Sequence, residues 1–162
     1  MKFEKDIKLR IPEEIYNKMI ECVRNAHPNE ACGLLFGKKR EIGIQEKENE
    51  FVYEYLGSKF ICIESDEKSP IAFLIKNEEK LNEIFIEAYK DFNMKLISIF
   101  HSHPLGNHPS RTDIKNMKML DKSNLKSYKY SIWSIMDSTN NSINGFMYYN
   151  DNLVQIDIKI EN

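Results

Sequence analysis

The stretch Lys95-Leu-Ile-Ser-Ile-Phe-His101-Ser-His103-Pro-Leu-Gly-Asn-His-Pro-Ser110-Arg-Thr-Asp113 joins a short apolar segment to a polar loop. In an extended strand, the apolar side chains at positions 96, 97, 99 and 100 point to both faces, so this strand is expected to be buried on each side. Three of the protein's 4 His residues follow within eight positions. The stretch therefore predicts a central strand that leads into a chemically active loop.

The two histidines that end the strand have the spacing of metal ligands. Side chains at i and i+2 of a strand project to the same face, so His101 and His103 can approach one ion. Ser110 and Asp113 have the spacing of a helix capping box, which places Asp113 in the first turn of a helix, where it can serve as a third ligand. Two imidazoles and a carboxylate leave one open position on Zn²⁺, as in catalytic rather than structural sites.

Other interpretations of this loop stay open at this point. His108 could replace Asp113 as a ligand, although a solvent-facing loop position suits it better. Two histidines and a carboxylate also bind non-haem Fe(II), so the ligand set alone does not select zinc. The histidine pair and the helix cap could also occur without any metal.

Outward from this loop, apolar periodicity predicts an alternation of helices and strands. Helical spacing marks residues 12–26, 77 to about 93, and 111–120. Strands are predicted at 31–37, 51–55, 60–63, 129–135, 142–149 and 154–160. No repeat or linker divides the chain, so we expect a single α/β (α+β) domain over residues 1–162, with a central mixed β-sheet flanked by helices.

Composition narrows the classes of protein. The formal net charge of −2 provides no global attraction to nucleic acid or anionic membranes, and no apolar stretch approaches the length of a membrane span. The cysteines at 22, 32 and 62 are odd in number and form no C-x-x-C pair, which predicts reduced thiols and a cytoplasmic location. Cys32 is expected to be a small buried residue rather than a nucleophile.

Two segments together resemble the JAMM (MPN+) metalloprotease family, in its prokaryotic stand-alone form. The first is His101-x-His103-Pro104 followed by Ser110-x-x-Asp113, and the second is Asn29-Glu-Ala-Cys-Gly-Leu-Leu-Phe-Gly37. The resemblance covers roughly residues 10–150 and implies a cytidine-deaminase-like architecture. The five residues between Pro104 and Ser110 are one fewer than is usual in the family, which affects the expected position of Ser110 more than that of the histidines.

The resemblance also implies roles and a reaction. It makes His101, His103 and Asp113 the zinc ligands, Glu30 the general base and acid, and Ser110 the residue that stabilises the oxyanion. It implies a metallo-isopeptidase that cleaves after the C-terminal glycine of a ubiquitin-like or sulfur-carrier-like modifier. Two alternatives are a peptidase of small amino-acid or peptide conjugates and an inactive MPN-type scaffold; the intact motif argues against the scaffold. Nothing in the sequence indicates an oligomeric state.

Overall fold

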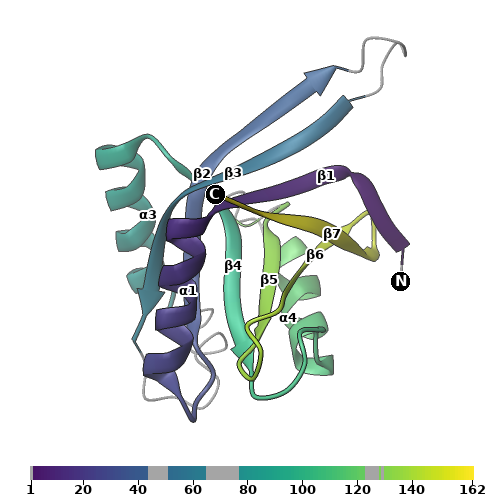
Figure 1. Cartoon of the computed structure of the whole chain (residues 1–162). Helices are drawn as coiled ribbons and strands as arrows, with labels where there is room; N and C mark the ends of the chain where they lie inside the picture. The colour runs from purple at the N-terminus through teal and green to yellow at the C-terminus, as the bar shows by residue number, and fades with distance from the viewer. Residues whose placement is uncertain (1, 44–50, 65–76, 123–127, 129) are drawn as a thin grey trace.

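The strands pair edge to edge into a closed barrel in the computed structural model, which describes residues 2–43, 51–64, 77–122, 128 and 130–162. Within these described residues, three helices pack around it (Figure 1). The elements are β1 (Lys2–Pro12), α1 (Glu13–Ala26), β2 (Cys32–Gly43), β3 (Phe51–Ile63), α3 (Glu78–Phe92), β4 (Lys95–His103), α4 (Arg111–Lys122), β5 (Ile132–Asp137), β6 (Ile143–Tyr149) and β7 (Asn152–Glu161).

The sheet is mixed, as expected, but its closure corrects the expected architecture. The strand order is β1-β3-β2-β4-β5-β6-β7, and β7 pairs in turn with β1. Three pairs are parallel, namely β1 with β3, β1 with β7, and β4 with β5; the others are antiparallel. The α+β class is confirmed, whereas a simple central sheet with helices on its faces does not describe the barrel.

The strand that closes the barrel is the one that the sequence analysis did not predict. β1 forms because Ile7, Leu9 and Ile11 alternate with polar or imino residues, and Leu9 and Ile11 are fully buried. β1 lies between β3 and β7 and pairs with both in parallel. Without it the other strands would form an open sheet, which is the arrangement that the sequence analysis expected.

β2 and β3 form a long antiparallel hairpin that extends well beyond the rest of the barrel (Figure 1). β3 is a single strand of 13 residues, although Gly57 and Ser58 were expected to separate two strands. The register of β2 against β3 shifts between Phe36 and Gly37. A Cβ on Gly37 would lie 1.8 Å from the carbonyl oxygen of Leu56, so only glycine allows this close approach.

Two apolar clusters flank the middle strands. α1 contributes Ile15, Met19 and Val23 to one cluster, and α4 contributes Met117 and Leu120 to the other, which α3 also joins. β4 supplies side chains to both clusters, so the prediction of a strand buried on both faces is confirmed. This packing positions the carboxyl end of β4 between the two clusters. None of the described helices is both long and apolar enough to cross a membrane.

The cysteines correct another expectation. The sulfur atoms of Cys22 in α1 and Cys62 in β3 form a disulfide, with the two Cα atoms 5.8 Å apart, and Cys32 is left as a buried free thiol. The prediction of three reduced thiols was wrong because the odd count conceals one close pair and one unpaired residue. Only the packing of α1 against β3 brings positions 22 and 62 together.

Candidate metal centre

The carboxyl end of β4 presents the two histidines to one point. His101 is 1% exposed and His103 is half-buried. Their Nε2 atoms lie 3.1 Å apart, because residues two apart on a strand share a face. The indole of Trp133 on β5 lies edge-on to the His101 ring at 6.0 Å between centroids. The Nδ1 atom of His101 is buried and has no hydrogen-bond partner among the described residues, so His101 engages its polar neighbours through Nε2.

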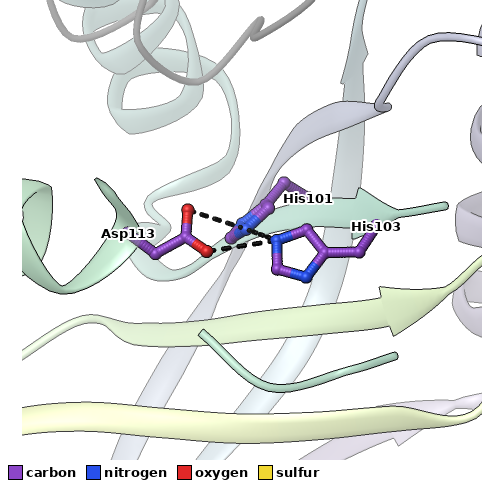
Figure 2. Close-up of side chains that lie close together, drawn as sticks. All are labelled: His101, His103 and Asp113. Atoms are coloured by element: carbon purple, nitrogen blue, oxygen red, sulfur yellow. Dashed lines mark hydrogen bonds and ion pairs between the residues drawn. The ribbon is translucent and has the colours of Figure 1, made fainter. Parts of the chain in front are cut away.

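The first turn of α4 brings the carboxylate. The Asp113 N–H donates to the hydroxyl of Ser110 at 3.1 Å, and the Ser110 N–H donates to Oδ2 of Asp113 at 2.7 Å. This reciprocal pair is a capping box with Asp in place of Glu or Gln. It holds the buried Asp113 side chain toward the strand end instead of toward solvent, as Figure 2 shows.

The three side chains converge closely enough to hold one ion. Oδ1 of Asp113 lies 3.2 Å from Nε2 of His101, and Oδ2 lies 3.1 Å from Nε2 of His103 (Figure 2). Ligand atoms around a tetrahedral Zn²⁺ are about 3.3–3.6 Å apart for bonds of about 2.0–2.2 Å. The cluster is therefore close to the size of a zinc site, and its two nitrogens and one carboxylate are donors that zinc accepts. The same donors also suit Fe(II).

Without a metal, the Asp113 carboxylate interacts with both imidazoles. Burial opposes the charged form of Asp113, but its hydrogen bonds with His101 and His103 prevail and hold its pKa below the usual range. The same hydrogen bond raises the pKa of His103 above 6.5. A preformed carboxylate facing two imidazoles is an arrangement that a divalent cation can take over by displacing protons.

Glu30 lies beside this cluster, immediately before β2. It is half-buried, and burial raises the pKa of its carboxyl group above 4.5. The charge on Asp113 raises this pKa further, while His101 and His103 oppose the increase, so all three are close enough to act on Glu30 electrostatically. A carboxylate with a raised pKa next to a metal site is suited to accept and return a proton.

The remaining sequence candidates differ in where they lie relative to this cluster. Ser110 is exposed at the start of α4, with its oxygen accepting the Asp113 N–H. His108 lies outside the cluster, with its ring 5.7 Å from that of Phe146. Cys32 is fully buried, and burial raises the pKa of its thiol to about 12, which keeps it protonated. The expectation that Cys32 is a buried structural residue agrees with both observations.

Two residues around the site were not singled out from the sequence. Asp137, at the carboxyl end of β5, accepts hydrogen bonds from the N–H groups of Gly106 and Thr139, at 2.8 Å each, and so ties down the histidine loop. Ser102 lies between the two histidines and bonds to Ala31. The sequence signal that could have found Asp137 is its place at the end of a predicted strand. Polar residues at the carboxyl ends of adjacent parallel strands meet at one edge of the sheet, and Asp137 pairs there with His103.

Comparison with known proteins places the chain in a family. Residues 12–146 match the family model for prokaryotic homologues of the JAB domain. The chain belongs to this family. The matched region contains Glu30, both histidines, Ser110 and Asp113, so the resemblance drawn from the two motifs is confirmed at the level of the family.

Relatives and solved structures agree with this membership. The chain is 31% identical over 108 residues to the CysO-cysteine peptidases of Mycobacterium tuberculosis and Mycobacterium bovis, a match that covers 66% of this chain and 64% of theirs. It thus spans somewhat less than two thirds of the length of these relatives.

Two solved structures share the fold at low sequence identity. The protein DSY2949 from Desulfitobacterium hafniense has a TM-score of 0.60 at 17% identity, covering 96% of this chain and 93% of that protein. A JAB1/MPN domain protein from Archaeoglobus fulgidus has a TM-score of 0.52 at 16% identity, covering 95% of this chain and 99% of that protein. These likenesses establish a JAB/MPN fold.

Proposed function

We propose that the protein is a zinc-dependent metallopeptidase that hydrolyses the bond after the C-terminal glycine of a ubiquitin-like or sulfur-carrier-like modifier. The observation that carries the proposal is the convergence of His101, His103 and Asp113 within reach of one ion, beside the half-buried Glu30. Membership of the JAB family and similarity to proteins named peptidases support a hydrolase.

In the proposed reaction each residue has a separate task. His101, His103 and Asp113 would hold Zn²⁺, which when bound supplies a Lewis acid that polarises a carbonyl and lowers the pKa of water toward ~7. Glu30 accepts a proton from the attacking water and delivers it to the leaving amine as the C–N bond breaks. The Ser110 oxygen accepts the Asp113 N–H through a lone pair, which leaves its own proton free to donate to the developing oxyanion.

The substrate class rests on the relatives and on the nature of the bond. The name CysO-cysteine peptidase supports the sulfur-carrier-like branch of the proposal. A glycine at the end of an extended tail has no side chain, so its carbonyl can approach a recessed cluster closely. Larger side chains next to the scissile bond would hinder this approach.

Linear fusions of a small β-grasp modifier to a reporter test this function. The terminal Gly-Gly of the modifier is kept or changed to Ala-Ala or Val-Val, and release of the reporter is measured with zinc-loaded protein. We expect cleavage of the Gly-Gly fusion only, and no cleavage by the His103→Ala variant. Equal cleavage of all three fusions, or hydrolysis of short unrelated peptides alone, would favour the alternative of a small-conjugate peptidase.

Metal content separates the enzyme from the scaffold alternative. Elemental analysis after zinc loading should give one zinc per wild-type chain and a negligible amount in a His101→Ala, His103→Ala variant. Equal and negligible zinc in both proteins would remove the metal centre from the proposal. The same outcome would leave an MPN-type scaffold as the interpretation of the fold.

Glu30→Gln tests the proton carrier without altering a ligand. Because the amide cannot accept the proton, turnover should fall by ~10²–10⁴-fold while the zinc content stays at the wild-type value. Turnover is measured on the Gly-Gly fusion and zinc by elemental analysis. Wild-type turnover in this variant would show that another group carries the proton.

A further inference from the structure

We propose that Ser102 is a positioning residue that holds Glu30 in place relative to the two histidines. This inference rests on the proposed role of Glu30. Ser102 is 1% exposed and lies between His101 and His103 on β4. Its side chain points to the opposite face of the strand from theirs, because successive residues of a strand alternate. It therefore cannot join the cluster and acts through another group.

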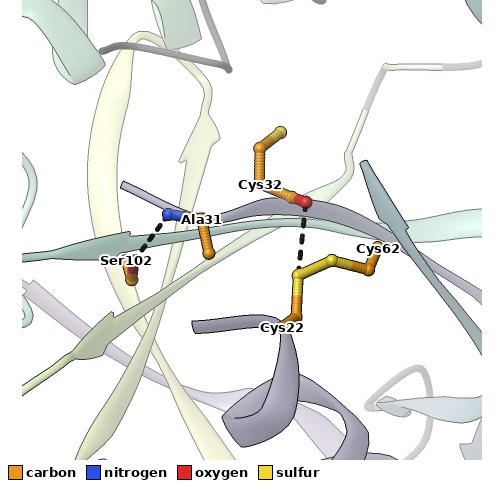
Figure 3. The surroundings of a disulfide bond; sticks show 5 residues. All are labelled: Cys22, Ala31, Cys32, Cys62 and Ser102. Carbon is orange, nitrogen blue, oxygen red and sulfur yellow. Dashed lines mark hydrogen bonds between the residues drawn. A yellow bond between two sulfur atoms is a disulfide. The ribbon is translucent and has the colours of Figure 1, made fainter. Parts of the chain in front are cut away.

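That group is the backbone that follows Glu30. The Ala31 N–H donates to the hydroxyl oxygen of Ser102 at 2.8 Å, and the Ser102 N–H donates to the carbonyl oxygen of Ala31 at 3.1 Å. Figure 3 shows the first of these bonds at the beginning of β2. The two peptide units on either side of Ala31 are thus both bonded to one residue of β4.

The first of these bonds constrains Glu30 directly. The peptide plane that contains the Ala31 N–H also contains the Cα atom of Glu30, because the peptide unit is planar. Fixing the direction of this N–H therefore limits the rotation that would swing the Glu30 side chain away from the cluster. Ser102 is joined by peptide bonds to both histidines, so its hydrogen bonds to Ala31 tie the backbone next to the proposed base to the segment that carries two proposed ligands.

The surroundings make this contact difficult to replace. Ala31 is 2% exposed, so water cannot readily take the place of the hydroxyl. Ala31 also precedes the first residue of β2, so the side-chain hydroxyl supplies an acceptor where the chain leaves the regular strand. Such a side-chain acceptor allows the backbone to depart from the ladder and still satisfy its buried donor.

Replacement of Ser102 by alanine should therefore lower turnover through Glu30. We expect the kcat for the Gly-Gly fusion to fall by ~10–10²-fold, because a small displacement of a catalytic group has effects of this size. KM and the zinc content should stay near wild type. Ser102→Thr and Ser102→Cys keep an acceptor at the same place, and at least one of them should recover most of the lost kcat.

A matched control exists on the same strand. Ser98 is fully buried, and its hydroxyl donates to the carbonyl oxygen of Ile132 and bonds to the Ser134 hydroxyl, away from Glu30. Ser98→Ala removes the same group from β4 and should lower the melting temperature without lowering kcat. A similar loss of kcat in both variants would mean that any buried serine of β4 acts through stability, and would overturn the proposal.

Combining Ser102→Ala with Glu30→Gln tests whether the loss of kcat depends on Glu30. If Ser102 acts through Glu30, Ser102→Ala should cause no further loss of residual turnover in Glu30→Gln. An equal fold-loss in both backgrounds, or a loss of zinc in Ser102→Ala, would overturn the proposal. Amide hydrogen exchange at Ala31 in the metal-free protein should accelerate in Ser102→Ala but not in Ser98→Ala.

The exchange measurement separates this inference from the proposed function. Absence of cleavage by the wild-type protein would count against the proposed function, whereas unchanged exchange at Ala31 in Ser102→Ala would count against the anchor itself. If Ser102→Ala does not fold, Ser102→Cys is compared with wild type: because sulfur is a weaker acceptor, exchange at Ala31 should be faster and kcat lower than in wild type. Faster exchange at Ala31 with wild-type kcat would overturn the proposal.

Discussion

The imidazole of His103 and the carboxylate of Asp113 set how metal binding should depend on pH. Asp113 raises the pKa of His103 above 6.5, while the lowered pKa of Asp113 keeps its carboxylate ionised at neutral pH. Only the neutral form of an imidazole can bind a metal. Zinc affinity should therefore fall as the pH is lowered through the raised pKa of His103, by up to about tenfold per pH unit for each displaced proton.

Competition titrations with a zinc chelator between about pH 6 and 9 check this expectation. His108→Asn is the matched control, because His108 is exposed and lies outside the cluster, and it should leave the pH dependence unchanged. A zinc affinity that stays constant from pH 9 to 6 would contradict the coupling of His103 to Asp113.

The folding stability of the metal-free protein should depend on pH in the opposite direction to zinc affinity over the range in which His103 titrates. A folded-state pKa of His103 above its unfolded value contributes stability that is full below the unfolded pKa of ~6.5 and is lost as the pH rises through the folded pKa. Asp113, with a lowered pKa, contributes stability that is lost as the pH falls below its unfolded value of ~3.9. The cluster should thus stabilise the metal-free fold most between about pH 4 and 6.5.

Residue spacing predicted part of this site. The i, i+2 histidines and the Ser-x-x-Asp pattern are local signals, and the structure brings His101, His103 and Asp113 together as local geometry requires. Glu30 has no such signal, because its proximity to β4 depends on the pairing of β2 with β4; only the family resemblance singled it out. Ser102 and Asp137 were missed for the same reason, since their partners are distant in sequence.

At the scale of elements, the start of α4 combines a helix cap with the position of the proposed oxyanion-stabilising residue. The shortened loop still ends with Ser110 capping the helix that begins at Arg111. Ser110→Ala should destabilise the protein by ~1 kcal/mol, because the Asp113 N–H loses its side-chain acceptor. If the hydroxyl also donates to the oxyanion, turnover should fall by ~10²-fold or more.

Ser110→Gly separates the two roles. Glycine at this position costs only a few tenths of a kcal/mol of helix stability, yet it also lacks the hydroxyl. Chemical denaturation measures stability, and the Gly-Gly fusion measures turnover. We expect the glycine variant to retain stability and lose turnover as fully as the alanine variant; wild-type turnover in Ser110→Gly would limit Ser110 to capping.

The sequence analysis missed β1 and divided β3 in two because local patterns do not show which strands pair. The alternation of Ile7, Leu9 and Ile11 with polar residues was present in the sequence, but charged residues around it concealed a half-buried strand. Gly57 was interpreted as a break, although it lies inside β3, where it pairs with Gly37. Periodicity reports which faces are apolar, whereas only long-range pairing shows which edges of a sheet are joined.

At the scale of the whole molecule, the disulfide links α1 to the β2–β3 hairpin across a sequence separation of 40 residues. Closing a loop of this length stabilises a folded chain by about 4 kcal/mol in the chain-entropy model, which corresponds to a change in melting temperature of roughly 8–16 °C for a protein of this size. We therefore expect a reductant to lower the melting temperature by several degrees or more. The barrel should still fold when reduced, because its apolar clusters do not depend on the bond.

Thiol titration and thermal melting check this prediction together. Denatured but unreduced protein should react with one equivalent of a thiol reagent, from Cys32, and reduced protein with three. A Cys22→Ala, Cys62→Ala variant should melt at a lower temperature that does not respond to reductant, whereas Cys32→Ala should keep the response. Three reactive thiols before reduction would show that the cysteines remain reduced in the purified protein. If the disulfide is present, a melting temperature that reductant does not change would show that the bond does not constrain the unfolded chain as the loop length predicts.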